Sequence, residues 1–104
     1  MITLQVIEKK ALKAFKIPFK GIKKAVKHDN GCRTSEARYM IYHIALSYGV
    51  TPDELASRYG KSRTNIIYGE MVATNLLTYD RVYQQRYRAI KIEIDNLIIN
   101  SYEN

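Results

Sequence analysis

The strongest constraint on the fold lies in the middle of the chain, in the stretch T-P-D-E-L-A-S-R-Y-G-K-S-R-T-N-I-I-Y-G at residues 51–69. Thr51 can cap a helix, and the acidic residue three positions later completes a capping box. Gly60 is free to take the left-handed conformation that ends such a helix and reverses the chain. Ser62 can then cap a second helix. The segment therefore predicts a helix-turn-helix motif.

The two predicted helices differ in their outward faces. Leu55 and Ala56 supply the apolar face of the first helix, and Tyr59 is expected to close the turn against the core. In the second helix the expected buried residues are Ile66, Ile67, Val72 and Ala73. The expected exposed residues are Arg63, Thr64, Asn65 and Tyr68. A polar start of this kind is typical of a helix that enters the DNA major groove. An ordinary helical hairpin with a polar surface is the simpler alternative.

Helical spacing of apolar residues also organises the first half of the chain. A first helix is predicted at about residues 3–15, ended by Lys16 and Ile17 before a proline. A short helical stretch is expected from Phe19 to Val26, followed by a turn-rich loop at residues 28–34. Thr34 or Ser35 would then cap a helix that runs to about Tyr48. Its predicted inward stripe consists of Ala37, Met40, Ile41, Ile44 and Ala45.

The second half continues in the same way. The second helix of the motif is predicted to span residues 62–77, with a break at Thr78–Asp80. The last helix, at about residues 80–100, has the apolar stripe Val82, Tyr83, Tyr87, Ile90, Ile94, Leu97 and Ile98. No alternation typical of strands appears anywhere. We therefore expect one all-α domain over residues 1–104, a compact bundle of five to six helices.

The charge of the chain favours a polyanionic partner. The net charge is +7 and the isoelectric point is about 9.6. Residues 1–38 carry ten basic and three acidic residues, whereas residues 39–104 carry seven of each. The whole excess therefore precedes the predicted helix-turn-helix, and a model of DNA binding must bring both regions onto one face.

Other features exclude several functional classes. Cys32 is the only cysteine, so no internal disulfide can form and no metal-ligand set arises with His28 and His43. No cofactor or metal is expected. The first residues become charged too soon for a signal peptide, and no apolar run approaches membrane-spanning length. These observations predict a soluble cytoplasmic protein without a membrane partner.

Four segments, in order, resemble a known family over Leu4 to about Ile98. The opening A-F-K-I-P-F-K-G-I resembles its first helix and continuation, and A-R-Y-M-I-Y at residues 37–42 resembles its A-R-[QH]-[IV]-A-M-Y signature. Glu54–Ala56 and Tyr59–Gly60 resemble its E-I-G and F-G, and Arg63–Gly69 resembles its H-[ST]-T-V-[IL]-H-A recognition helix. The chain thus resembles the C-terminal DNA-binding domain of the bacterial replication initiator DnaA, of the Trp-repressor-like superfamily.

The resemblance implies a double-stranded DNA partner contacted in both grooves. The recognition helix at 62–77 would enter the major groove, and a basic loop at 20–38 would contact phosphates and the minor groove. Arg33 is the best candidate for the minor groove, because a guanidinium fits a narrow one. The residues expected to contact DNA are Lys20, Lys23, Lys24, Lys27, Arg33, Arg38, Lys61, Ser62, Arg63, Thr64, Asn65 and Tyr68.

The chain departs from the family in two respects. Its turn, G-K-S-R, is one residue shorter than the family's G-G-R-D-H, so Arg63 takes the histidine position. Arg63 could pair with guanine and Asn65 with adenine, while Thr64 could meet a thymine methyl group or a phosphate. The preferred base sequence is therefore open. The phosphate loop of the family's ATPase portion is also absent, which suggests a free-standing module in transcription or replication control, associated with the nucleoid.

Three other functions were weighed. An enzyme is not expected, because His28, Asp29 and Cys32 imply neither an orienting third group nor a substrate pocket. A protein-interaction module, either an adaptor or an inhibitor, could use tyrosines along the last helix for a partner or a second copy. A satisfied core with hydroxyls at its rim is the plainer explanation of these tyrosines. Single-stranded RNA ranks below duplex DNA, because the tyrosines fall mostly at core spacing.

Overall fold

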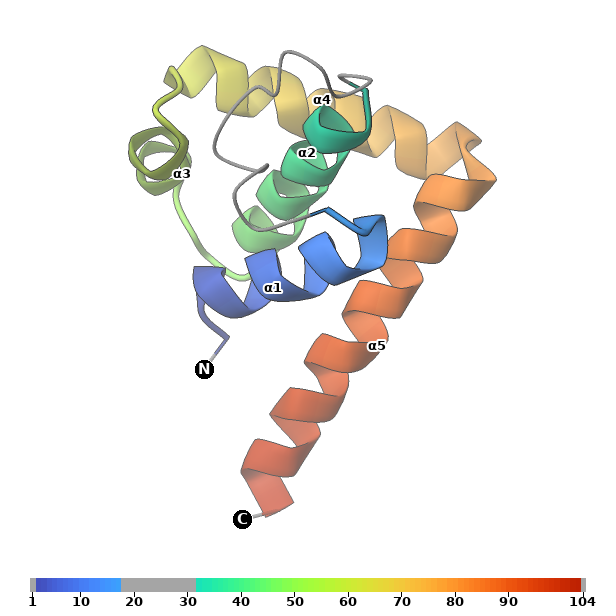
Figure 1. Cartoon of the computed structure of the whole chain (residues 1–104). Helices are drawn as coiled ribbons and strands as arrows, with labels where there is room; N and C mark the ends of the chain where they lie inside the picture. Colours follow the sequence, from blue (N-terminus) through green and yellow to red (C-terminus); the bar gives the residue numbers. More distant parts are fainter. Residues whose placement is uncertain (1, 18–31, 104) are drawn as a thin grey trace.

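The computed structural model describes residues 2–17 and 32–103, and within them the chain forms five α-helices (Figure 1). Their bounds are Leu4–Phe15 (α1), Cys32–Ser47 (α2), Pro52–Tyr59 (α3), Arg63–Tyr79 (α4) and Arg81–Glu103 (α5). No strand occurs in these two stretches. The predicted all-α class is confirmed. The short helix expected from Phe19 to Val26 lies outside the described residues.

Helix α2 is the centre of the packing. It contacts both α1 and α4, and each of these two helices also packs against α5, while α3 packs against α4. The predicted inward stripe of α2 is confirmed, since all five members are fully buried: Ala37, Met40, Ile41, Ile44 and Ala45. In Figure 1, α4 crosses one end of the molecule, and α5 runs away from it and passes the C-terminal end of α1.

Local interactions mark both ends of helix α1, which lies close to its predicted range. The Thr3 hydroxyl accepts a hydrogen bond from the Val6 amide, and Lys16 ends the helix in the left-handed conformation with φ of 56°. Its buried face includes Phe15, whose ring meets the ring of Tyr83 edge-on at 5.9 Å between centroids. This aromatic contact joins α1 to α5.

Helix boundaries differ from the prediction at three places. Helix α2 begins at Cys32, inside the region expected to be a loop, so residues 32–38 of the expected basic loop are helical. No glycine or proline follows residue 31 in this stretch, so nothing in the backbone opposes the earlier start. Helix α4 continues to Tyr79 and α5 to Glu103, each beyond the predicted end.

Three apolar residues predicted to be buried are exposed. Ile67, Val82 and Leu97 expose 56%, 53% and 39% of their surface. Neighbouring positions in a helix point about 100° apart, and α4, unlike the central helix α2, is not covered on both of the sides that carry Ile66 and Ile67. It buries Ile66. The predicted apolar stripes of α4 and α5 therefore included residues that no other helix covers.

Candidate nucleic-acid interface

Local hydrogen bonds define the chain reversal between α3 and α4. The Thr51 hydroxyl caps α3 by accepting from the Glu54 amide at 3.1 Å. Gly60 follows α3 in the left-handed conformation, with φ of 63°. The Ser62 hydroxyl then caps α4 by accepting from the Asn65 amide at 3.1 Å. The predicted caps and glycine turn are confirmed, and they set where the first residues of α4 emerge.

The first turns of α4 expose both polar and aromatic side chains. Arg63 and Thr64 are exposed, as predicted, and Tyr68 exposes 52% of its surface. Arg63 makes one long ion pair, at 3.9 Å, with the exposed Asp53 of α3. Exposed pairs of this kind contribute little to stability, so the guanidinium remains available to a ligand.

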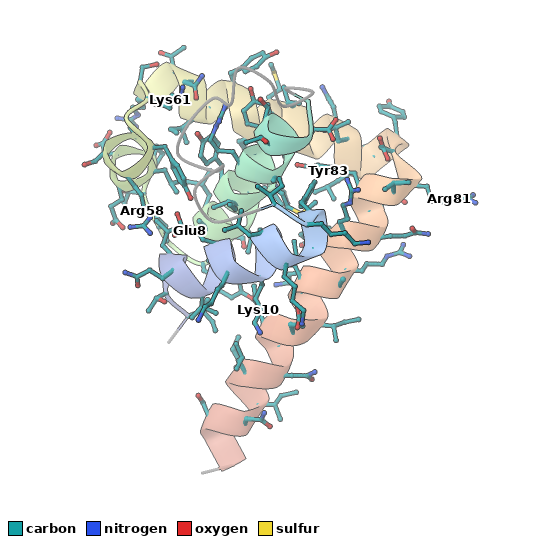
Figure 2. All side chains as sticks on the ribbon, in the orientation of Figure 1. Glu8, Lys10, Arg58, Lys61, Arg81 and Tyr83 are labelled. Carbon is teal, nitrogen blue, oxygen red and sulfur yellow. The ribbon has the colours of Figure 1, made fainter. Side chains whose placement is uncertain are left out.

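Two predicted contact residues next to this surface are less accessible. Asn65 is half-buried, and its amide oxygen is buried without a hydrogen-bond partner among the described residues. Lys61 is also half-buried, whereas Ser62 is exposed but uses its hydroxyl in the cap. Figure 2 shows Lys61 at the α3–α4 turn and Arg81 far from it, at the start of α5.

Arg38, which was expected to contact DNA, is buried. It exposes only 6% of its surface, and its Nε has no hydrogen-bond partner among the described residues. Its guanidinium carbon lies 5.6 Å from the ring centroid of Tyr39. Burial raises the pKa of the neighbouring Tyr42 hydroxyl, and the Arg38 charge opposes that rise. Arg38 is thus packed among aromatic rings of its own helix rather than presented to DNA.

The predicted basic region extends beyond the described residues. Lys20, Lys23, Lys24 and Lys27 lie outside the described residues. The backbone of Arg33 belongs to the first turn of α2, but its side chain is not described. The proximity of the basic region to α4 therefore stays a prediction.

A buried carboxylate that was not predicted from the sequence anchors α3. Glu8 of α1 is fully buried and accepts hydrogen bonds from the Arg58 guanidinium, with its Nε at 2.7 Å, and from the Tyr59 hydroxyl. Figure 2 shows Arg58 directed from α3 towards Glu8. Burial, followed by the hydrogen bond to Glu8, raises the pKa of Tyr59. An acid within the apolar stripe of α1 was the signal that could have revealed this anchor.

Helix α4 packs closely against α2 at a glycine. Gly69 is buried, and a β-carbon at this position would lie 2.5 Å from a ring atom of Tyr39 and within 2.9 Å of two ring atoms of Tyr42. The Tyr39 ring also meets the exposed Tyr68 ring edge-on at 6.2 Å. The absence of a side chain at position 69 thus allows the close approach that holds the exposed face of α4 in place.

His43 connects α2 to the middle of α4. Its Nδ1 hydrogen-bonds a Glu70 carboxylate oxygen at 2.9 Å, and its ring meets the Tyr87 ring edge-on at 5.8 Å. His43 is half-buried and lines a shallow hollow with Leu77, Gln84, Tyr87 and Arg88. Its hydrogen bond therefore serves to join the two helices.

No group of three or more His, Cys, Asp or Glu side chains in residues 2–17 and 32–103 could hold a metal ion. Within those same stretches, no helix combines the length and the apolar composition that crossing a membrane requires. In comparisons with known proteins, no family model and no curated protein matches the chain.

Proposed function

We propose that this protein binds duplex DNA, with α4 in the major groove and the basic segment at 20–38 on phosphates or in the minor groove. The exposed cluster at the start of α4, Arg63, Thr64 and Tyr68, carries the proposal. It directly follows the Gly60 turn, where a helix-turn-helix protein presents its base-contacting side chains. The resemblance of the sequence to the DnaA C-terminal domain supports the same arrangement.

Arg63 is the residue best suited to select a base. A guanidinium can donate two hydrogen bonds to O6 and N7 of guanine, the commonest base-specific contact. Its long ion pair with Asp53 is exposed on both sides, so a guanine can displace it at small cost. Thr64 would meet a thymine methyl group or a phosphate. Asn65 would first have to turn its buried amide oxygen outward.

The biological role follows from the resemblance alone. A DNA-binding module of the DnaA type would act in the control of transcription or replication. Such a role places the protein in the cytoplasm, at the nucleoid.

Fluorescence anisotropy with labelled duplexes tests the proposal. Affinity should fall steeply with salt concentration, because bound lysines and arginines release counterions from the phosphates. After selection of a preferred site from a random duplex pool, Arg63→Ala should lose about 1–3 kcal/mol of preference for that site. Lys24→Ala should instead weaken binding to all sequences alike. Arg81→Ala is the matched control, since Arg81 is also exposed but lies beyond the far end of α4.

A protein-interaction module is the second candidate. The proposed tyrosine surface on α5 is reduced, because Tyr83 exposes only 1% of its surface and donates its hydroxyl to the Glu36 carbonyl at 2.7 Å. Ile67 and Met71, one turn apart on α4, instead expose 56% and 55%. Exposed apolar side chains in such a row suit a protein partner. Absence of duplex binding at low salt would reject the DNA proposal and favour this candidate.

A further inference from the structure

Beyond its polar start, the free side of α4 carries a row of weakly polar side chains. Ile67 and Met71 expose 56% and 55% of their surface, and Thr74 and Thr78 follow at exposed positions. At 100° per residue, all four fall within about 60° of one another around the helix. Positions two apart point about 200° apart, so Ile67 and Met71 point away from Gly69, which packs against α2. We call these four residues the outer row.

The hydroxyl protons in the outer row are already used within α4. The Thr74 hydroxyl donates to the Glu70 carbonyl at 3.0 Å, and the Thr78 hydroxyl donates to the Thr74 carbonyl at 2.9 Å. Ile67 has no polar atom in its side chain, and the thioether of Met71 is at most a weak acceptor. What Ile67 and Met71 have to offer a ligand is therefore contact through carbon and sulfur.

The surroundings of these two apolar side chains favour a DNA groove over a protein surface. The exposed positions around them carry hydroxyl or amide groups: Thr64, Tyr68, Thr74, Asn75 and Thr78. A pair of apolar side chains among polar ones is narrower than the contiguous apolar patch that marks a protein interface. Arg63, one turn before Ile67, is the cation of α4, and its acid, Glu70, is bound by His43. On a chain of net charge +7, this face suits a polyanion.

The major groove contains one apolar group that such side chains can meet. Of the four bases, thymine alone presents a methyl group there, on its C5 atom. Ile67 and Met71 lie about 6 Å apart along the axis of α4, and successive base pairs are about 3.4 Å apart. The two side chains can therefore meet methyl groups that are one or two base steps apart. Arg63 lies another 6 Å or so towards the start of the helix, where it would meet its guanine.

We propose that Ile67 and Met71 recognise two thymines in the major groove through their C5-methyl groups. This inference rests on the proposed DNA binding and adds the class of site that the protein selects. That site has a guanine at the Arg63 end and thymines, on either strand, within the next few base pairs. Phosphate contacts carry the salt dependence of binding, so the two methyl contacts add sequence preference without adding to it.

Uracil substitution tests the proposal, because uracil keeps the hydrogen-bonding groups of thymine and lacks its methyl group. The probe is the duplex that the full chain selects from a random pool, with its thymines replaced one at a time, and fluorescence anisotropy measures the affinity. Uracil at each of two positions should weaken binding about fourfold, the effect of one buried methyl group, and at both by about tenfold or more. A C·G pair at either position should bind more tightly with 5-methylcytosine than with cytosine, since the same methyl group is restored.

Two alanine variants assign the methyl groups to side chains. Ile67→Ala and Met71→Ala should each bind the selected duplex about fourfold or more weakly, with the salt dependence of the parent. Each should lose the uracil penalty at one thymine and keep it at the other. Ile92→Ala is the matched control, because Ile92 exposes 60% of its surface but lies on α5, which runs away from α4 in Figure 1. It should keep the affinity of the parent and both penalties. Alanine favours helix at all three exposed positions, so the fold is retained.

The outcomes separate this inference from DNA binding itself. Duplex binding to a selected site in which uracil and thymine bind equally well would overturn thymine recognition and leave the DNA proposal standing. A uracil penalty that persists in both alanine variants would also overturn it, since other residues would then meet the methyl groups. Absence of duplex binding at low salt would overturn both proposals and leave Ile67 and Met71 to a protein partner.

Discussion

Gly69→Ala is the substitution that most directly tests how α4 is held. The added β-carbon would lie 2.5 Å from a ring atom of Tyr39 and 2.8 and 2.9 Å from two ring atoms of Tyr42. Favourable carbon contacts lie at about 3.5–4.0 Å, so the closest overlap is about 1 Å. Tyr42 is fully buried and packs against Tyr59 at 5.6 Å, which leaves it little room to move. Helix α4 must therefore shift away from α2.

The net effect is a balance of two terms. Overpacking a well-filled site costs about 1–3 kcal/mol. Alanine also raises the helix propensity of this position by about 1 kcal/mol relative to glycine. Because a rigid buried ring meets the new atom, we expect the upper part of the first range. The predicted net loss in free energy of unfolding is then about 1–2 kcal/mol.

Urea denaturation followed by circular dichroism measures this loss. Asn75→Ala, at an exposed position of the same helix, is the control and should leave the protein unchanged or slightly more stable. Tyr39→Ala should remove part of the Gly69→Ala penalty in a double-mutant cycle, since it removes the closest clashing ring. Equal or greater stability of Gly69→Ala relative to the parent would refute the close seating of α4 on α2.

Three further predictions concern contacts of α1 and α5. Glu8→Gln should lower the free energy of unfolding by about 3 kcal/mol, as measured by urea denaturation. This value is at the lower end of the range for breaking a buried ion pair, because water reaches part of the Arg58 side chain. An unchanged urea midpoint would contradict a stabilising role of the Glu8–Arg58 pair. A hydrogen bond from Lys13 lowers the pKa of the Glu93 carboxyl, so its ionised form stabilises the fold above the unfolded pKa. Glu93→Gln should therefore lose up to about 1 kcal/mol at pH 7, and the difference should disappear as the pH falls through the lowered pKa; a difference independent of pH would exclude this linkage. Tyr83→Phe should lower the free energy of unfolding by about 1 kcal/mol, because it removes the hydrogen bond from the Tyr83 hydroxyl to the Glu36 carbonyl of α2. An unchanged melting temperature would argue against a contribution from that hydrogen bond.

Helix ends were the most predictable part of this structure. The caps at Thr51 and Ser62 and the left-handed Gly60 each depend on groups within about four residues of one another. Asp80 caps α5 in the same way, since its carboxylate accepts from the Tyr83 amide at 3.0 Å. Such hydrogen bonds form with little help from the rest of the molecule, so residue type and spacing suffice to predict them.

Side-chain burial was less predictable. Ile66 and Ile67 are chemically identical neighbours, yet one is fully buried and the other is 56% exposed. Arg38 carries a permanent charge but lies almost completely buried among tyrosine rings. Both outcomes depend on which surface of another helix covers the residue. Residue type alone therefore misplaced Ile67 in the core and Arg38 on the surface.

The sequence by itself determined the all-α class, most helix boundaries and the fully buried stripe of α2, because hydrophobic periodicity and capping act over a few residues. Only the tertiary structure decided which face of α4 is free, since that depends on the fit of Gly69 against two tyrosine rings. The same holds for the Glu8 anchor, whose partners stand 50 and 51 residues away. Contacts this distant arise from the packing of whole helices, so a local pattern can indicate a buried acid but cannot identify its partners.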